Sequence, residues 1–241
     1  MSSAQFQRRW TSLLSGTLET WVYQLLYQRH VYPKETFACS KFLGVRVHLN
    51  RQPAVVSYVT NTIKVAAPSL VAGVADIFSL VIIETDEHDC DADGEVTART
   101  NAREIEKYVI RFSNDSCRSS DKITLGTIEV LERGMRDLIL AVNGLPSERT
   151  TSSDSVSFKL SLHIPSKDTS CTELNQAFAV GEWFVPEISD ATQRGVVIRP
   201  LHQFSDESSI GSVQFAMQRT TAKMTDNRKP PPSTRETNGL T

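Results

Sequence analysis

Hydrophobic residues recur at steps of three and four near the start of the chain, and this spacing predicts a helix over residues 7–29. Its apolar face consists of Trp10, Leu13, Leu14, Leu18, Trp21, Val22, Leu25 and Leu26. Gly16 weakens the middle of this helix by roughly 1 kcal/mol relative to alanine, so packing against other elements must hold it. The width of the apolar face predicts the central helix of the domain. The exit at Val31-Tyr32-Pro33 is interpreted as its structural end and not as a surface that binds a partner.

Strand patterns and a second helix follow. Residues 37–49 predict a short hairpin that turns at Gly44. Pro53 suits the first position of a helix, because its missing N–H is no loss there, and this helix is expected to stop near Pro68. Residues 76–84 are almost continuously apolar, which predicts a strand buried on both faces. Residues 105–112 alternate between apolar and polar and predict a further strand.

The second half of the chain predicts one more helix and then several strands. A helical stripe consists of Ile128, Leu131, Met135, Leu138 and Val142, with Ser119, Ser120 or Asp121 as the cap and Gly144-Leu145-Pro146 as the end. Residues 156–164 alternate strictly, as a strand with one buried face does. Apolar clusters and polar loops alternate over residues 165–218. The pattern predicts an α+β fold in which three helices cover one face of a mostly antiparallel sheet.

Composition narrows the class of protein. The 241 residues suit one large domain or two small ones, and 26 basic against 28 acidic residues argue against a nucleic-acid-binding surface over the whole domain. Residues 219–241 carry five basic and two acidic residues with three consecutive prolines, and are expected to be disordered. The start of the chain has no apolar signal segment, and no run approaches a membrane span. A soluble intracellular protein is expected.

The cysteines and histidines show no spacing typical of a metal or redox site. The cysteines are Cys39, Cys90, Cys117 and Cys171, and the histidines are His30, His48, His88, His163 and His202. Without a CxxC or HxxxH pair, neither a zinc site nor a disulfide framework is predicted, and reduced thiols are expected. The sequence also lacks the nucleophile and phosphate-binding motifs GxSxG, GxxxxGK[ST] and GxGxxG. An enzyme is therefore not expected, and neither is a cofactor.

One acidic segment allows an alternative interpretation as a calcium-binding loop. Asp89, Asp91 and Asp93-Gly94 have the spacing that opens a calcium loop, but the twelfth position is Thr100 where a glutamate is required. The flanking segments predict strands and not helices. A solvated hairpin loop is the favoured interpretation.

Three side chains allow both a structural and a binding interpretation. Trp183 combines a large apolar area with a donor, so it suits either the core or the wall of a peptide groove, and its residue type favours the core. Tyr58 flanks the apolar face of the second helix and suits either role as well. Arg136 is four residues after Glu132, which predicts a surface ion pair or an anchor for another protein.

Several short motifs occur together in a defined order. They are LLYQRHVYP at 25–33, Pro53 with Tyr58, LVIIE followed by EIEKYVIRF, MRDLILAVN, VSFKLSLHI, Trp183-Phe184-Val185, and IRPL at 198–201. In this order, over about residues 6–218, the chain resembles the HORMA-domain family, and within it the accessory subunits of translesion DNA polymerase zeta. Relative to that family, the loop at 84–104 is longer and the proline-containing tail is additional.

The resemblance implies a binding module. In HORMA domains a C-terminal segment, here about 165–218, wraps as a safety belt around a partner peptide that adds a strand to the sheet edge. In the polymerase-zeta subunits this peptide is a proline-containing segment of the catalytic subunit of DNA polymerase zeta. Tyr58, Trp183 and Val185 match positions that line its groove, so the resemblance reverses the interpretation of Trp183 as a core residue.

The resemblance implies two further surfaces. Arg136 matches an arginine used for dimerisation with another HORMA protomer, as a homodimer or a heterodimer. Ile198 and Gln214 match positions that contact a second, deoxycytidyl-transferring translesion polymerase. Ala216 departs from the family here, because an aromatic residue is expected at its position.

The sequence is thus interpreted as one HORMA domain at 6–218 followed by a basic tail at 219–241. The expected function is that of a non-catalytic adaptor in translesion synthesis and DNA repair, with no metal, no membrane partner and no direct contact with nucleic acid. The expected location is the nucleus, with the cytoplasm as a second one. The alternative within the family is a spindle-checkpoint or meiotic-axis adaptor, and the alternative outside it is an enzyme or calcium-binding protein.

Overall fold

The computed structural model describes residues 3–85, 102–113, 125–147, 156–164, 196–206 and 211–220. Three long helices are α1 (Ser3–Gln28), α2 (Pro53–Val71) and α3 (Leu125–Asn143), and a short 3-10 helix η1 (Lys34–Thr36) follows α1. Pro53 occupies the first turn of α2, where its ring fits the helical backbone and the absent N–H has no partner to lose.

The strands form two sheets. A separate hairpin consists of β1 (Phe37–Phe42) and β2 (Val45–Asn50), joined at Leu43 and Gly44 with φ values of 46° and 77°. Two successive positive φ values are typical of the turn that matches strand twist, and glycine accepts this conformation at little cost. The larger sheet consists of β3 (Ile77–Thr85), β4 (Ala102–Ser113), β5 (Val156–His163), β6 (Val196–Asp206) and β7 (Gly211–Thr220). Its order is β5-β3-β4-β7-β6, and every described pair is antiparallel.

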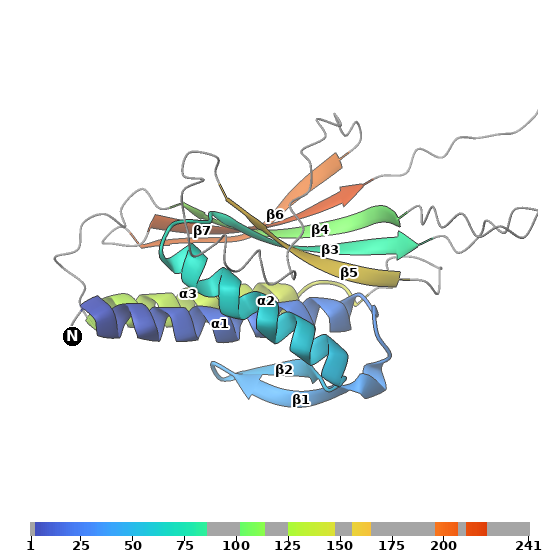
Figure 1. Cartoon of the computed structure of the whole chain (residues 1–241), viewed down its shortest axis with the longest axis horizontal. Coiled ribbons are helices and arrows are strands. Elements are labelled where there is room, and N and C mark those ends of the chain that lie inside the picture. Colours follow the sequence, from blue (N-terminus) through green and yellow to red (C-terminus); the bar gives the residue numbers. More distant parts are fainter. Residues whose placement is uncertain are drawn as a thin grey trace, which may run out of the picture.

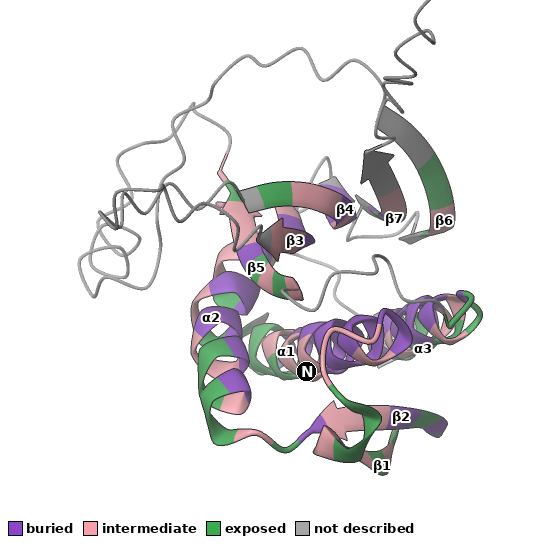
Figure 2. Ribbon diagram, turned by 90° about the vertical axis from the view of Figure 1, so that its right-hand side faces the viewer, coloured by how far each residue is buried: buried purple, intermediate pink, exposed green. Residues whose placement is uncertain are grey.

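The helices lie between the two sheets, with α1 enclosed most completely (Figures 1 and 2). Leu18, Trp21 and Leu25 of α1 are fully buried, as expected for a central helix. Trp21 contacts the rings of Phe78 in β3 and Phe215 in β7, at centroid distances of 6.0 and 5.7 Å. One apolar core therefore joins the first helix to the middle and the end of the chain.

Most of the predicted elements are confirmed, with differences at their ends. Five consecutive residues of β3, 78–82, are buried, which confirms a strand covered on both faces. The second helix does not stop near Pro68 but continues to Val71, because the proline lies in the last turn and few helical hydrogen bonds remain to be broken. The last strand continues to Thr220, so the expected domain boundary after residue 218 falls within β7.

Other expectations lie outside the described residues. They concern the acidic segment at 86–101, the cap of the third helix, residues 165–195 with Trp183 and Val185, and the tail at 221–241. Of the helices that are described, none is both long and apolar enough to cross a membrane. The described histidine, cysteine and acidic side chains form no group of three that could hold a metal ion.

Candidate functional site

The strand β5 forms one edge of the five-stranded sheet. It pairs with β3 on one side, and among the described residues no strand pairs with its other side. An unpaired edge presents backbone N–H and C=O groups that can pair with another chain. This makes the outer side of β5 the first candidate for a binding site.

Hydrogen bonds identify which residues of β5 face outward. The carbonyl of His163 accepts a hydrogen bond from the Asp76 N–H at 3.2 Å, so odd-numbered residues of β5 direct their backbone groups toward β3. Because this direction alternates along an antiparallel strand, the even-numbered Val156, Phe158, Leu160 and Leu162 direct theirs outward. In agreement, the Leu160 N–H donates to the hydroxyl oxygen of Tyr58 at 3.1 Å.

Three aromatic side chains gather beside this edge, here termed the aromatic cluster: Tyr32, Tyr58 and Phe158. Phe158 contacts both tyrosine rings edge-on, with centroid distances of 5.6 Å to Tyr58 and 6.2 Å to Tyr32. Tyr58 is 38% exposed, whereas Tyr32 and Phe158 are half-buried. Burial raises the pKa of Tyr32, and the neighbouring Tyr58 raises it further.

Each member of the cluster comes from a different part of the chain. Tyr58 lies one turn into α2, Phe158 lies near the start of β5, and Tyr32 belongs to the exit of α1. The sequence interpretation of that exit as only a structural end is therefore incomplete, because it supplies a wall of the candidate site. The alternation of 156–164 did place Phe158 on the inner face, but no local pattern indicated that Tyr32 would meet it.

A buried ion pair between Arg29 and Glu106 joins distant segments of the chain. The Arg29 Nε donates to Glu106 Oε2 at 2.8 Å, and Arg29 Nη1 donates to the carbonyl of Pro146 at 2.6 Å. The Tyr108 hydroxyl donates to Glu106 Oε2 at 2.7 Å, and Arg29 Nη2 lies 3.7 Å from the sulfur of Met217 in β7. These contacts connect α1, β4, the segment after α3 and β7. They were not predicted from the sequence.

The electrostatics of this pair follow from its burial. The side chains of Arg29 and Glu106 are 5% and 0% exposed. Burial alone would lower the pKa of Arg29, but Tyr108 and Glu106 outweigh it and the pKa is raised. For Tyr108, burial and then the Glu106 carboxylate raise the pKa, so the phenol stays protonated. A buried ion pair with these contacts suits a structural role.

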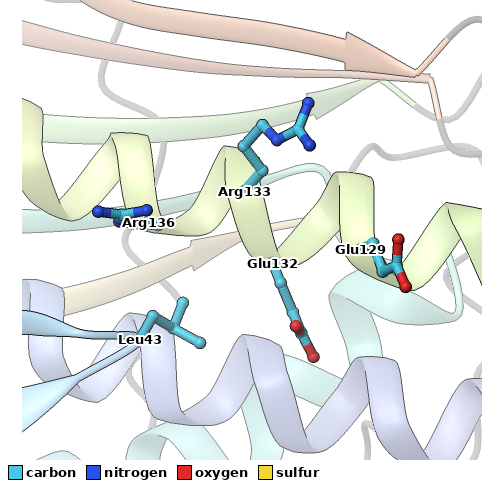
Figure 3. Close-up of a pocket in the computed structure, with 5 residues that line it drawn as sticks. All are labelled: Leu43, Glu129, Glu132, Arg133 and Arg136. Carbon is cyan, nitrogen blue, oxygen red and sulfur yellow. The ribbon is translucent and has the colours of Figure 1, made fainter.

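Arg136 lies on an exposed face of α3. It lines a shallow pocket together with Glu129, Glu132, Arg133 and with Leu43 from the hairpin turn (Figure 3). The expected partner Glu132 instead lies 4.0 Å from Arg9 of α1, an exposed pair of little energetic weight. The exposed apolar side chains Val130 and Leu140 belong to the same helix.

The third predicted surface lies on β6 and β7. Gln214 is exposed and pairs in register with Gln203, while Ala216 is half-buried and pairs with Pro200. Ile198 lies on β6 opposite Gln218 in register. The structure thus brings Ile198, Gln214 and Ala216 onto two adjacent strands, at the opposite edge of the sheet from Tyr58.

No protein-family model and no curated protein matches this chain. Solved structures do match. A chain in a crystal structure of the mitotic checkpoint complex is 17% identical over 88% of this chain and 95% of its own length, with a TM-score of 0.58. The C. elegans protein HTP-2 bound to a HIM-3 closure motif is 11% identical over 88% and 90% of the two chains, with a TM-score of 0.54. C. elegans HTP-1 bound to the same motif is 10% identical over 87% and 89%, with a TM-score of 0.52.

Identities this low identify the fold and nothing finer. The three helices and the antiparallel sheets have the fold of HORMA-domain structures, which confirms the predicted α+β class.

Proposed function

We propose that this HORMA-fold chain is a non-catalytic adaptor that binds a peptide segment of another protein along the outer side of β5. The observation that carries the proposal is the edge of β5, with which no strand among the described residues pairs, and the aromatic cluster beside it. Two of the similar structures, HTP-2 and HTP-1, are bound to closure motifs. A peptide that adds a strand gains backbone hydrogen bonds for affinity and side-chain pockets for specificity.

The two edges of the sheet differ in their suitability for strand addition. The edge strand β6 contains Pro200, which has no N–H, and its register shifts between Pro200 and His202. Prolines and bulges are features that protect an edge from pairing. In contrast, β5 has no proline and keeps a regular register with β3 over its whole length. The β5 edge is therefore the favoured site.

The finer proposal is an accessory subunit of translesion DNA polymerase zeta in DNA repair, located in the nucleus. Its support is the sequence resemblance, together with the position of Tyr58 at the favoured edge. The partner would be a proline-containing segment of the catalytic subunit, because aromatic side chains suit proline rings. Trp183 and Val185 would complete the groove from the belt.

A checkpoint or meiotic-axis adaptor is the second candidate. One similar chain belongs to the mitotic checkpoint complex, and this favours a closure peptide of a checkpoint protein. The two candidates use the same edge and differ in the peptide that it accepts. Under either one, Arg136 would serve dimerisation with a second HORMA protomer. Ile198, Gln214 and Ala216 would form the contact with a second polymerase under the first candidate only.

A binding assay with variants of the edge tests the proposal. Fluorescent peptides would be used: the proline-containing segment of the polymerase-zeta catalytic subunit and a HIM-3 closure motif. We expect Tyr58→Ala, Phe158→Ala and Trp183→Ala each to weaken binding of the cognate peptide by about tenfold or more, as loss of an aromatic anchor does. Lys159→Ala is the matched control, because the backbone groups of Lys159 face β3 and its side chain pairs with Glu104.

The outcomes separate the alternatives. Tight binding of the polymerase segment alone supports the polymerase-zeta function, and tight binding of the closure motif alone supports the checkpoint or meiotic one. If the aromatic variants bind as well as the Lys159→Ala control, the site is not the β5 edge.

A further inference from the structure

Tyr58 makes two different contacts with the edge strand. Its ring packs edge-on against Phe158 at 5.6 Å, and its hydroxyl oxygen accepts the hydrogen bond from the Leu160 N–H at 3.1 Å. The first contact is apolar and the second engages a backbone donor of the edge. A side chain of α2 therefore occupies a position on β5 that the acceptor of an added strand would take.

We propose that the hydroxyl of Tyr58 is a lock on the β5 edge, which must release the Leu160 N–H before a partner segment can pair along the strand. This inference rests on the proposed function, because it concerns access to the same edge. It assigns separate roles to two parts of one side chain: the ring contributes to binding, and the hydroxyl opposes it.

The position of Leu160 makes the lock effective. The outward-facing residues of β5 are Val156, Phe158, Leu160 and Leu162, so Leu160 has outward-facing residues on both sides of it. An added strand needs the N–H of each outward residue for a continuous ladder. While the Leu160 N–H is bonded to Tyr58, an added strand cannot form one continuous ladder of hydrogen bonds along β5.

The lock is also able to open. Tyr58 is 38% exposed, so its hydroxyl can leave the strand without unpacking the core. One neutral hydrogen bond contributes only modestly in net terms, because water or a peptide carbonyl can replace the partner. A partner segment that forms several hydrogen bonds and aromatic contacts with β5 can displace the Tyr58 hydroxyl. A strand that forms few such contacts cannot. The same contact would protect the β5 edge against pairing with unrelated strands.

Amide hydrogen exchange of the free full-length protein tests the lock without any partner. Tyr58→Phe keeps the ring on Phe158 and removes only the hydroxyl. We expect the Leu160 amide to exchange about fivefold faster in this variant, the change that corresponds to one net hydrogen bond. The amides of Lys159 and Ser161, which face β3, should exchange as before. Tyr27→Phe is the control, because that tyrosine stacks on His48 of the hairpin instead. Equal exchange of Leu160 in Tyr58→Phe and the parent would overturn the lock.

Binding kinetics supply the second arm, with the polymerase-zeta peptide as the probe. A lock that acts in the free protein reduces the fraction competent to bind, so Tyr58→Phe should raise the association rate about fivefold and leave dissociation unchanged. Faster dissociation of the variant would show that the hydroxyl instead contacts the peptide, and would overturn the proposal. If neither protein binds the peptide or the closure motif, the proposed function fails, and the Leu160 exchange rates still decide the lock.

Discussion

At the scale of single residues, Arg29 shows how one side chain can join distant parts of this chain. Its guanidinium reaches a carboxylate, a backbone carbonyl and the sulfur of Met217 at once. Arginine presents five donors in a rigid fork, whereas a lysine ammonium at the same place could not satisfy acceptors in several directions. Arg29 also follows the last residue of α1, where a positive charge interacts favourably with the helix dipole.

Removing this charge should strongly destabilise the fold. We expect Arg29→Met to lower the free energy of unfolding by about 3–5 kcal/mol, because it removes one charge of a buried ion pair. Urea denaturation measures the effect. Lys159→Ala is the comparison, since it removes an exposed ion pair with Glu104 and should cost less than about 1 kcal/mol. Equal losses in both variants would contradict a structural role for Arg29.

At the scale of elements, the contact between α1 and the β1–β2 hairpin depends on a glycine. A methyl group at Gly16 would lie 2.8 Å from Cε2 of Phe42, closer than real side chains approach. Gly16 therefore lowers the helix propensity of α1 but allows the hairpin to pack closely on it. The glycine that weakens the isolated helix serves the assembled structure.

This predicts an unusual response to a helix-favouring substitution. Gly16→Ala should gain about 1 kcal/mol of helix propensity yet lose about 1–3 kcal/mol to overpacking, and so lower the melting temperature. In a Phe42→Leu background the obstacle is smaller, and the same substitution should be neutral or stabilising. Thermal unfolding of the parent, Gly16→Ala, Phe42→Leu and the double variant checks this. Stabilisation by Gly16→Ala in the parent would mean that the ring of Phe42 moves away freely.

At the scale of the whole molecule, the helices and the sheet edges expose separate surfaces. The strands β5 and β6 form the two opposite edges of the sheet (Figure 1). The aromatic cluster lies beside β5, and the pocket of α3 includes Leu43 of the hairpin turn (Figure 3). The proposed adaptor function would use this separation, because a peptide bound at β5 would leave the other two surfaces accessible. Under that proposal, Arg136 and Tyr58 would act at separate surfaces.

The exposed position of Arg136 on α3 leads to a prediction about self-association of the protein. If Arg136 contributes to a contact between protomers, Arg136→Glu should weaken self-association by about tenfold or more, as removal of an interface arginine does, and leave peptide binding unchanged. Sedimentation velocity over a concentration series measures the association. Lys64→Glu reverses an exposed charge on α2 and serves as the control. If Arg136→Glu and this control associate equally, dimerisation does not use α3.

The candidate site was predictable only in part. The resemblance indicated Tyr58 as a groove residue, and the structure places it beside the edge strand β5, whereas the residue type alone allowed a core position as well. Tyr32 was not expected in the site, because nothing in the exit of α1 indicates what packs against it. Trp183 and Val185 stay predictions, since they lie outside the described residues.

The sequence by itself determined the elements of this protein: the three helices, the hairpin turn at Gly44 and the alternation of β5. These follow from local periodicity and from the backbone preferences of glycine and proline, which act over a few residues. Only the tertiary structure decided which strand is left at an edge, and that Tyr58 meets the N–H of Leu160 from 102 positions away. Such a contact depends on how the helices pack on the sheet, and many packings share the same local pattern.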